Sequence, residues 1–172
     1  MSVVAVAVKE GTIEIASDSI SVRGLTQTKA NNKFSKLVYI NDMYIGFVGE
    51  AEEGSLFTLF ANTRKPEQTT EAGIVAYLSE FADWKNNKIG KASIENDYII
   101  IIAGKVFQVE GFFVQEIVSY SAIGAGSDYA LAALYLGETP VVAVETACEL
   151  SVFCEKPIKH FKVIVKTGEK EL

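Results

Sequence analysis

The sequence is poor in histidine and cysteine, with only His160, Cys148 and Cys154 among 172 residues. A single imidazole provides too few ligands for most metal sites and argues against a Ser–His–Asp triad, for which no G-x-S-x-G motif is present either. The two cysteines lie in an apolar context, which is typical of small buried residues in a reducing cytosol. We therefore expect neither a metal nor a cofactor.

Long hydrophobic runs and basic tracts are also missing. The composition is 49% hydrophobic with a mean hydropathy of +0.21, yet no run approaches the roughly 20 apolar residues of a membrane span. No signal peptide is recognisable at the N-terminus, so we expect a cytoplasmic protein without membrane contact. The net charge of −6 and the absence of clustered lysines argue against nucleic-acid binding. So apolar a composition suggests that further surface is buried between subunits.

The remaining pattern predicts a single domain over residues 1–172, since this length can bury a full core. Short apolar runs separated by tight turns alternate with two pairs of amphipathic helices. The first strand is apolar on both faces, as expected when both faces are covered. Antiparallel hairpins without βαβ units predict an α+β fold, a four-layer αββα sandwich of two antiparallel sheets flanked by helices. The expected strands are 2–8, 12–17, 19–22, 25–30, 34–40, 43–48, 96–103, 106–110, 112–117, 119–123 and 159–166, and the expected helices are 50–62, 70–86, 127–136 and 140–153.

Ser2 is the candidate nucleophile. If Met1 is removed, the α-amine of Ser2 has a reference pKa of about 7.7–8.0 and can accept the proton of its own hydroxyl. Ser2 and Asp18 are expected at the open ends of one hairpin, and Lys33 follows a short second hairpin. A lysine ammonium would lower the pKa of the amine and hydroxyl, and Asp18 would hold that lysine charged and oriented. Backbone N–H groups within 46–49 are candidate oxyanion donors.

The order and spacing of several segments resemble the proteasome β-subunit and bacterial HslV-like family of N-terminal nucleophile hydrolases. The resemblance covers nearly the whole chain and is carried by the segments 2–8, 15–18, 32–37, 45–49, 56–60, 82–84 and 122–130. It implies Ser2 as nucleophile, Asp18 and Lys33 as its supporting pair, and Gly46 as the oxyanion donor. It also implies a peptidase that acts on polypeptides and forms homo-oligomeric rings, with two stacked hexamers favoured. An AAA+ ATP-dependent unfoldase is the implied partner.

The sequence also departs from that family. The usual nucleophile there is threonine, whose methyl group restricts the rotamer of the hydroxyl. Ala125 stands where the family usually has a serine that hydrogen-bonds near the nucleophile's amine. The spacing from Ser2 to Lys33 is one residue short, a difference that the hairpin at Arg23-Gly24 would absorb. Two interpretations therefore stay open: a Ser-type self-compartmentalising peptidase, and a catalytically silent ring protein with the same fold.

Overall fold

The computed structural model describes residues 1–28 and 34–165. Within these residues it has four helices and three sheets, which confirms the predicted α+β class. The helices are α1 (Ala51–Ala61), α2 (Glu71–Ile89), α3 (Ser127–Tyr135) and α4 (Pro140–Leu150). The strands are β1 (Val4–Lys9), β2 (Thr12–Ser17), β3 (Ser21–Arg23), β4 (Thr26–Thr28), β5 (Leu37–Ile40), β6 (Met43–Val48), β7 (Asp97–Ile102), β8 (Lys105–Glu110), β9 (Phe113–Ile117), β10 (Tyr120–Ile123) and β11 (Lys159–Ile164).

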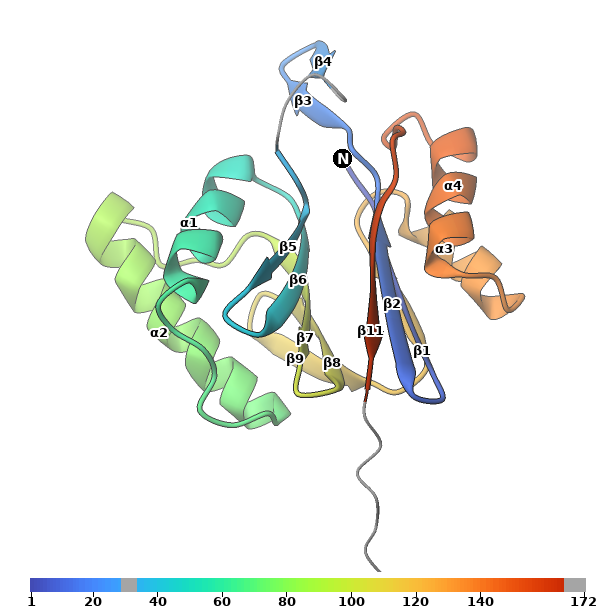
Figure 1. Ribbon diagram of the computed structural model, residues 1–172. Coiled ribbons are helices and arrows are strands. Elements are labelled where there is room, and N and C mark those ends of the chain that lie inside the picture. The colour runs from blue at the N-terminus through green and yellow to red at the C-terminus, as the bar shows by residue number, and fades with distance from the viewer. Residues whose placement is uncertain (29–33, 166–172) are drawn as a thin grey trace, which may run out of the picture.

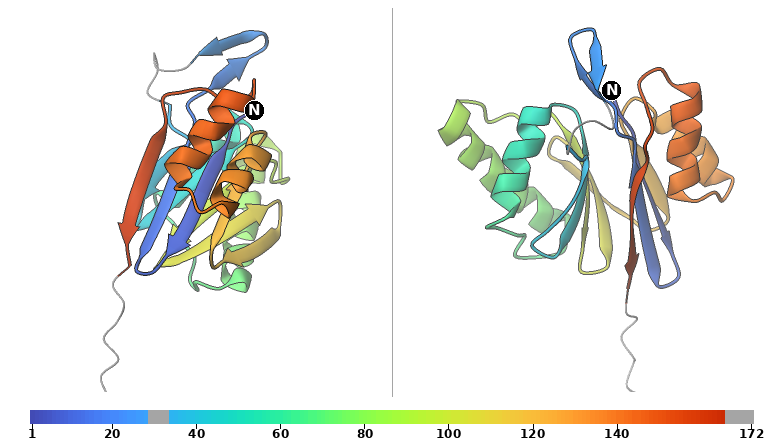
Figure 2. Two further views of the ribbon diagram at one scale, coloured as in Figure 1. Left: turned by 90° about the vertical axis from the view of Figure 1, so that its right-hand side faces the viewer. Right: turned by 45° about the horizontal axis from the view of Figure 1, so that its top comes forward.

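Two antiparallel sheets face each other, and a pair of helices covers the outer side of each (Figure 1). One sheet has the strand order β10-β1-β2-β11 and lies under α3 and α4. The other has the order β5-β6-β7-β8-β9 and lies under α1 and α2. The short hairpin β3–β4 projects from the end of the sandwich at which the N-terminus lies (Figure 2). This end brings together chain segments that are distant in sequence.

Strand β1 shows why four layers form. Its residues alternate between small and branched apolar side chains instead of between polar and apolar ones. Ala5 and Ala7 pack against α3 and α4, whereas Val4 and Val6 pack between the sheets against β2, β7 and β8 residues. A strand with two apolar faces is stable only when both are covered. The predicted burial of this strand on both sides is confirmed, and it places the adjoining Ser2 inside the molecule.

The core under α1 and α2 is largely aromatic. Phe57, Phe60 and Phe81 form tilted and edge-on contacts with one another and with Tyr77 and Tyr98. Such pairs stabilise by about 0.5–1.5 kcal/mol beyond the area they bury. This packing fixes α1, whose first residues border the candidate site, against β7.

Most expected boundaries agree with the structure to within a few residues, and two helix ends differ. Helix α2 is expected to end at residue 86, but it continues to Ile89, and Gly90 ends it in the left-handed conformation. Helix α4 was expected to reach residue 153, but it ends at Leu150 because residues 151–154 turn back toward the sheet. This turn lets the Glu155 N–H reach Asp18, so tertiary contacts decide where α4 stops.

Candidate active site

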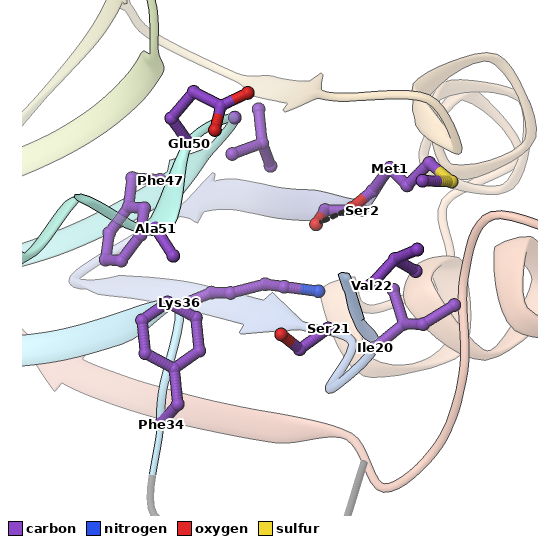
Figure 3. A pocket seen from close by; sticks show the side chains of 12 residues that line it. Met1, Ser2, Ile20, Ser21, Val22, Phe34, Lys36, Phe47, Glu50 and Ala51 are labelled. Carbon is purple, nitrogen blue, oxygen red and sulfur yellow. Dashed lines mark hydrogen bonds between the residues drawn. The ribbon is translucent and has the colours of Figure 1, made fainter. Parts of the chain in front are cut away.

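The candidate site is a pocket of about 200 Å³ at the end of the sandwich that carries the N-terminus. Its walls come from the residues that precede β1, from the start of β3, from the segment before β5, and from the end of β6 and the turn into α1. Figure 3 shows the Lys36 side chain reaching across the pocket from the β5 side, with Ser2 and Glu50 on other walls. The lining residues are Met1, Ser2, Ile20, Ser21, Val22, Phe34, Lys36, Phe47, Val48, Gly49, Glu50 and Ala51.

Ser2 lies at the floor of this pocket and is 3% exposed. Its carbonyl oxygen accepts a hydrogen bond from the Gly126 N–H at 3.2 Å, and its hydroxyl donates to the Met1 carbonyl (Figure 3). Met1 itself is 55% exposed. With Met1 attached, the Ser2 nitrogen is an amide and has no basic lone pair. The backbone of Ser2 is therefore held firmly, and its chemistry depends on the removal of one exposed residue.

Asp18 connects four parts of the chain at this site. The Oδ1 atom accepts hydrogen bonds from the Val3 N–H at 3.0 Å and from the Lys36 ammonium at 2.7 Å. The Oδ2 atom accepts from the Ile20 N–H at 3.1 Å and from the Glu155 N–H at 3.2 Å. The prediction that Asp18 lies beside Ser2 at the open end of the β1–β2 hairpin agrees with the bond to Val3. Asp18 is thus a buried carboxylate whose acceptor sites on both oxygens are used.

The lysine that the structure places against Asp18 is Lys36, whereas the sequence analysis assigned this role to Lys33. Lys33 lies outside the described residues. Lys36 immediately precedes β5, and its carbonyl pairs with the Phe47 N–H of β6, which anchors its backbone at the sheet edge. Both lysines follow the β3–β4 hairpin, and residue spacing alone could not distinguish between them.

Burial lowers the pKa of Lys36 below its usual value of 10.5, and the charge and hydrogen bond of Asp18 act in the opposite direction. The two side chains of the pair are only 6% and 0% exposed. A charge held in so dry an environment acts more strongly on its neighbours than the same charge at the surface. Lys36 therefore provides a positive charge that acts on groups within the pocket.

The two candidate oxyanion glycines occupy different places. Gly46 lies in β6 between the sheets, where a Cβ atom would meet Val4 at 2.7 Å, and it does not line the pocket. Gly49 does line the pocket, at the turn into α1, and has a φ of +122°. Phe47 and Val48 line the pocket as well, but the Phe47 N–H is bonded to the Lys36 carbonyl. Among the glycines of 46–49, the candidate donor is Gly49. The role of Gly46 is close packing of the two sheets.

The turn 124–126 encloses the Ser2 backbone from the opposite side. A Cβ atom on Gly124 would lie 2.5 Å from the Ser2 carbonyl oxygen, and one on Gly126 would lie 2.5 Å from the Cys154 sulfur. Both glycines are therefore required for the close approach of this turn to the N-terminal strand. Ala125, between them, is exposed. The sequence analysis did not connect this Gly-Ala-Gly turn with the packing of Ser2.

Other reactive groups are unsuited to catalysis. Burial raises the pKa of Cys148 to about 12 and that of Cys154 to about 11, so both thiols stay protonated near neutral pH. Over residues 1–28 and 34–165, no cluster of three or more histidine, cysteine or acidic side chains could hold a metal ion. In the same part of the chain, none of the helices has the length and apolar character needed to cross a membrane.

No protein-family model matches the sequence. Solved structures nevertheless share the whole architecture. BPH from Thiobacillus denitrificans, solved in complex with epoxomicin, superposes with a TM-score of 0.86 and 23% identity over 95% of this chain and 98% of that chain. HslV from Trypanosoma brucei gives 0.70 and 19% identity over 94% and 99%. Anbu (ancestral beta-subunit) from Yersinia bercovieri gives 0.71 and 12% identity over 94% and 81%.

Proposed function

Because the chain has the fold of the proteasome-like N-terminal nucleophile hydrolases, we propose that it is a peptidase whose nucleophile is Ser2 after removal of Met1. One observation carries the proposal. The hydroxyl of Ser2, the ammonium of Lys36 and the backbone of Gly49 line the same pocket, and Asp18 holds the lysine. Lys36 takes the role that the sequence analysis gave to Lys33, and Gly49 takes the one given to Gly46.

In the proposed reaction, the Ser2 hydroxyl attacks the carbonyl carbon of a peptide bond. Its proton passes to the free α-amine of Ser2, which is partly neutral near pH 8. The Gly49 N–H stabilises the oxyanion of the tetrahedral intermediate, and the Lys36 charge stabilises the developing alkoxide. The leaving amine then takes the proton from the α-ammonium as the C–N bond breaks. Water hydrolyses the resulting ester with the α-amine again acting as base.

Assembly into a homo-oligomeric ring is part of the proposal. The α3–α4 layer and the segment after it expose large apolar side chains, among them Tyr135 at 77%, Leu136 at 79% and Val152 at 85%. Exposed apolar groups gathered on one layer are typical of surfaces that bury on association. We propose a cytoplasmic assembly, with two stacked hexameric rings as the working stoichiometry, that degrades polypeptides delivered by an AAA+ unfoldase.

A catalytically silent ring protein is the second candidate. One observation favours it: Ala125 provides no hydroxyl beside the Gly126 N–H that contacts Ser2. In that case the Asp18–Lys36 pair would serve only to hold together the segments that meet at this end of the sandwich.

Turnover of small peptide amides separates the two functions. The assembled, Met1-free protein is compared with Ser2→Ala, with Ser2→Thr and with a form whose N-terminus is acetylated. We expect slow turnover by the wild type and at least equal turnover by Ser2→Thr, because the added methyl group restricts χ1 without changing the hydroxyl. The Ser2→Ala and acetylated forms should be inactive. Equal turnover by Ser2→Ala and wild type would contradict the peptidase function.

A further inference from the structure

Asn96 makes a two-point contact with the turn that borders the pocket. Its Oδ1 atom accepts a hydrogen bond from the Glu50 N–H at 2.6 Å, and its Nδ2 group donates to the Glu50 carbonyl at 2.9 Å. Asn96 is completely buried. Glu50 is the N-cap of α1 and has no side-chain capping bond of its own. The amide of Asn96 therefore fixes the peptide planes on both sides of Glu50.

The turn needs such a clamp because Gly49 precedes Glu50. A glycine at a φ of +122° is in a region that other residues rarely adopt, and glycine on its own has access to many alternatives. A Cβ atom on Gly49 would lie 2.2 Å from the Asn96 Oδ1 atom, so the backbone and the carboxamide are in direct contact. Asn96 thereby restricts the one residue of the pocket wall with the greatest conformational freedom.

Asn96 is itself held by a buried charged network. The Asn96 N–H donates to Glu53 Oε1 at 3.0 Å, and the Tyr98 hydroxyl donates to the same oxygen at 3.0 Å. The Lys85 ammonium of α2 binds the other oxygen of Glu53 and also the Ser93 carbonyl. Glu53 and Lys85 are 5% and 2% exposed. The clamp on Glu50 is thus anchored in the helical layer and not only in the loop.

We propose that Asn96 is a positioning residue that holds the segment Gly49–Ala51 in the conformation in which the Gly49 N–H serves as oxyanion donor. This role in catalysis rests on the proposed function. Asn96 touches no reacting atom and acts through Gly49 and Glu50. Displacing a catalytic group by about 1 Å costs on the order of 100-fold in rate. Loss of the clamp should therefore lower kcat and leave ground-state binding nearly unchanged.

The test uses Asn96→Ala and Asn96→Asp in the assembled, Met1-free protein, with Asn86→Asp on the exposed side of α2 as a matched control. Both Asn96 variants should lower kcat about 10- to 100-fold, with KM changed less than about twofold. In Asn96→Ala, which adds no titratable group, the acid limb of the pH–rate profile, which reports the Ser2 amine, should not move. Asn86→Asp should behave as the wild type does.

Site-resolved hydrogen exchange gives a second readout that does not depend on activity. The Glu50 amide should lose protection in Asn96→Ala, and lose less in Asn96→Asp, whose carboxylate can still accept the Glu50 N–H. The amides of β7 and β8 should keep theirs in both variants. In Asn96→Asp the protection should rise as the pH falls, because the ionised carboxylate only accepts and repels the Glu50 carbonyl, whereas a protonated carboxyl can donate to that carbonyl. Unchanged protection of Glu50 would overturn the proposal, as would an equal loss across β7 and β8, which indicates a merely structural role. If the wild type shows no turnover, the proposed function fails, and exchange still decides whether Asn96 holds this segment.

Discussion

The ammonium of Lys36 lies 2.7 Å from the carboxylate of Asp18, and both side chains are almost completely shielded from solvent. The carboxylate also accepts three backbone N–H groups, so its position is set by the fold and not by the lysine alone. In contrast, Asp18 is the only hydrogen-bond partner of the Lys36 ammonium among the described residues. Asp18 therefore orients Lys36, and Lys36 supplies the charge that acts in the pocket.

Lys36→Met should abolish peptidase activity, whereas Lys33→Met should not. Removing the ammonium withdraws the charge that stabilises the Ser2 alkoxide, and the loss of one such group costs about 100- to 1,000-fold. Both variants remove one positive charge from the same part of the chain, so Lys33→Met is the matched control. Peptide turnover of both variants is measured at equal oligomeric state, checked by light scattering. An inactive Lys33→Met together with an active Lys36→Met would return the role to Lys33.

Activity at alkaline pH should fall before the protein loses stability. Burial lowers the folded-state pKa of Lys36 below 10.5, so its charge is lost at a lower pH than that of an exposed lysine. Between the folded and unfolded pKa values the unfolded state binds more protons, and the contribution of Lys36 to stability therefore rises with pH. Turnover and urea unfolding are measured on the same samples from about pH 7 to pH 10.5. Loss of activity that coincides with unfolding would contradict this assignment.

Ser17→Ala should leave the protein as stable as the wild type or slightly more stable. Ser17 is fully buried, and its hydroxyl has no hydrogen-bond partner among the described residues. An unpaired buried hydroxyl costs about 1–3 kcal/mol of desolvation, which the substitution removes. Ser121→Ala is the control, because the Ser121 hydroxyl donates to Gln108 and its loss should destabilise. Urea unfolding midpoints compare the two, and a large destabilisation by Ser17→Ala would indicate a hidden partner.

Lys85→Met should be strongly destabilising although Lys85 does not line the candidate pocket. The substitution leaves Glu53 buried without its cation, and breaking such a pair costs about 3–5 kcal/mol. The double variant Lys85→Met, Glu53→Gln should recover part of this loss, because it leaves no unpaired charge. Urea unfolding of both variants tests the prediction. A single variant as stable as the wild type would show that the pair is not required.

The strands and helices could be predicted because the hydrophobic periodicity, the turn residues and the helix-capping residues indicate the same boundaries for nearly every element. Thr70 accepts a bond from the Gly73 N–H and Gly90 ends α2 in the left-handed conformation, as local rules require. The site was harder to predict. Lys33 and Lys36 cannot be distinguished by their local sequence pattern. The same holds for Gly46 and Gly49, and only the structure shows that Gly49 lines the pocket. These choices depend on how the two sheets face each other, which no local pattern contains.

Lys85 shows the same limit of prediction from local sequence. It falls on the apolar face of α2 in line with Ile74, Leu78 and Phe81, and it is buried there as they are. Its position could be read from periodicity, but its partner Glu53 lies 32 residues away. The link from this pair through Asn96 to the pocket became visible only in the structure.

Covalent labelling followed by intact-mass measurement tests the central claim most directly. An epoxyketone such as epoxomicin, which is bound in the BPH structure, offers a ketone and an epoxide to which a hydroxyl and an amine on one residue can both add. The assembled, Met1-free protein should gain the mass of one inhibitor per chain. The Ser2→Ala and N-acetylated forms, which lack the hydroxyl and the free amine respectively, should gain none. A Met1-free protein that stays unlabelled, or equal labelling of Ser2→Ala, would contradict the assignment of Ser2 as nucleophile.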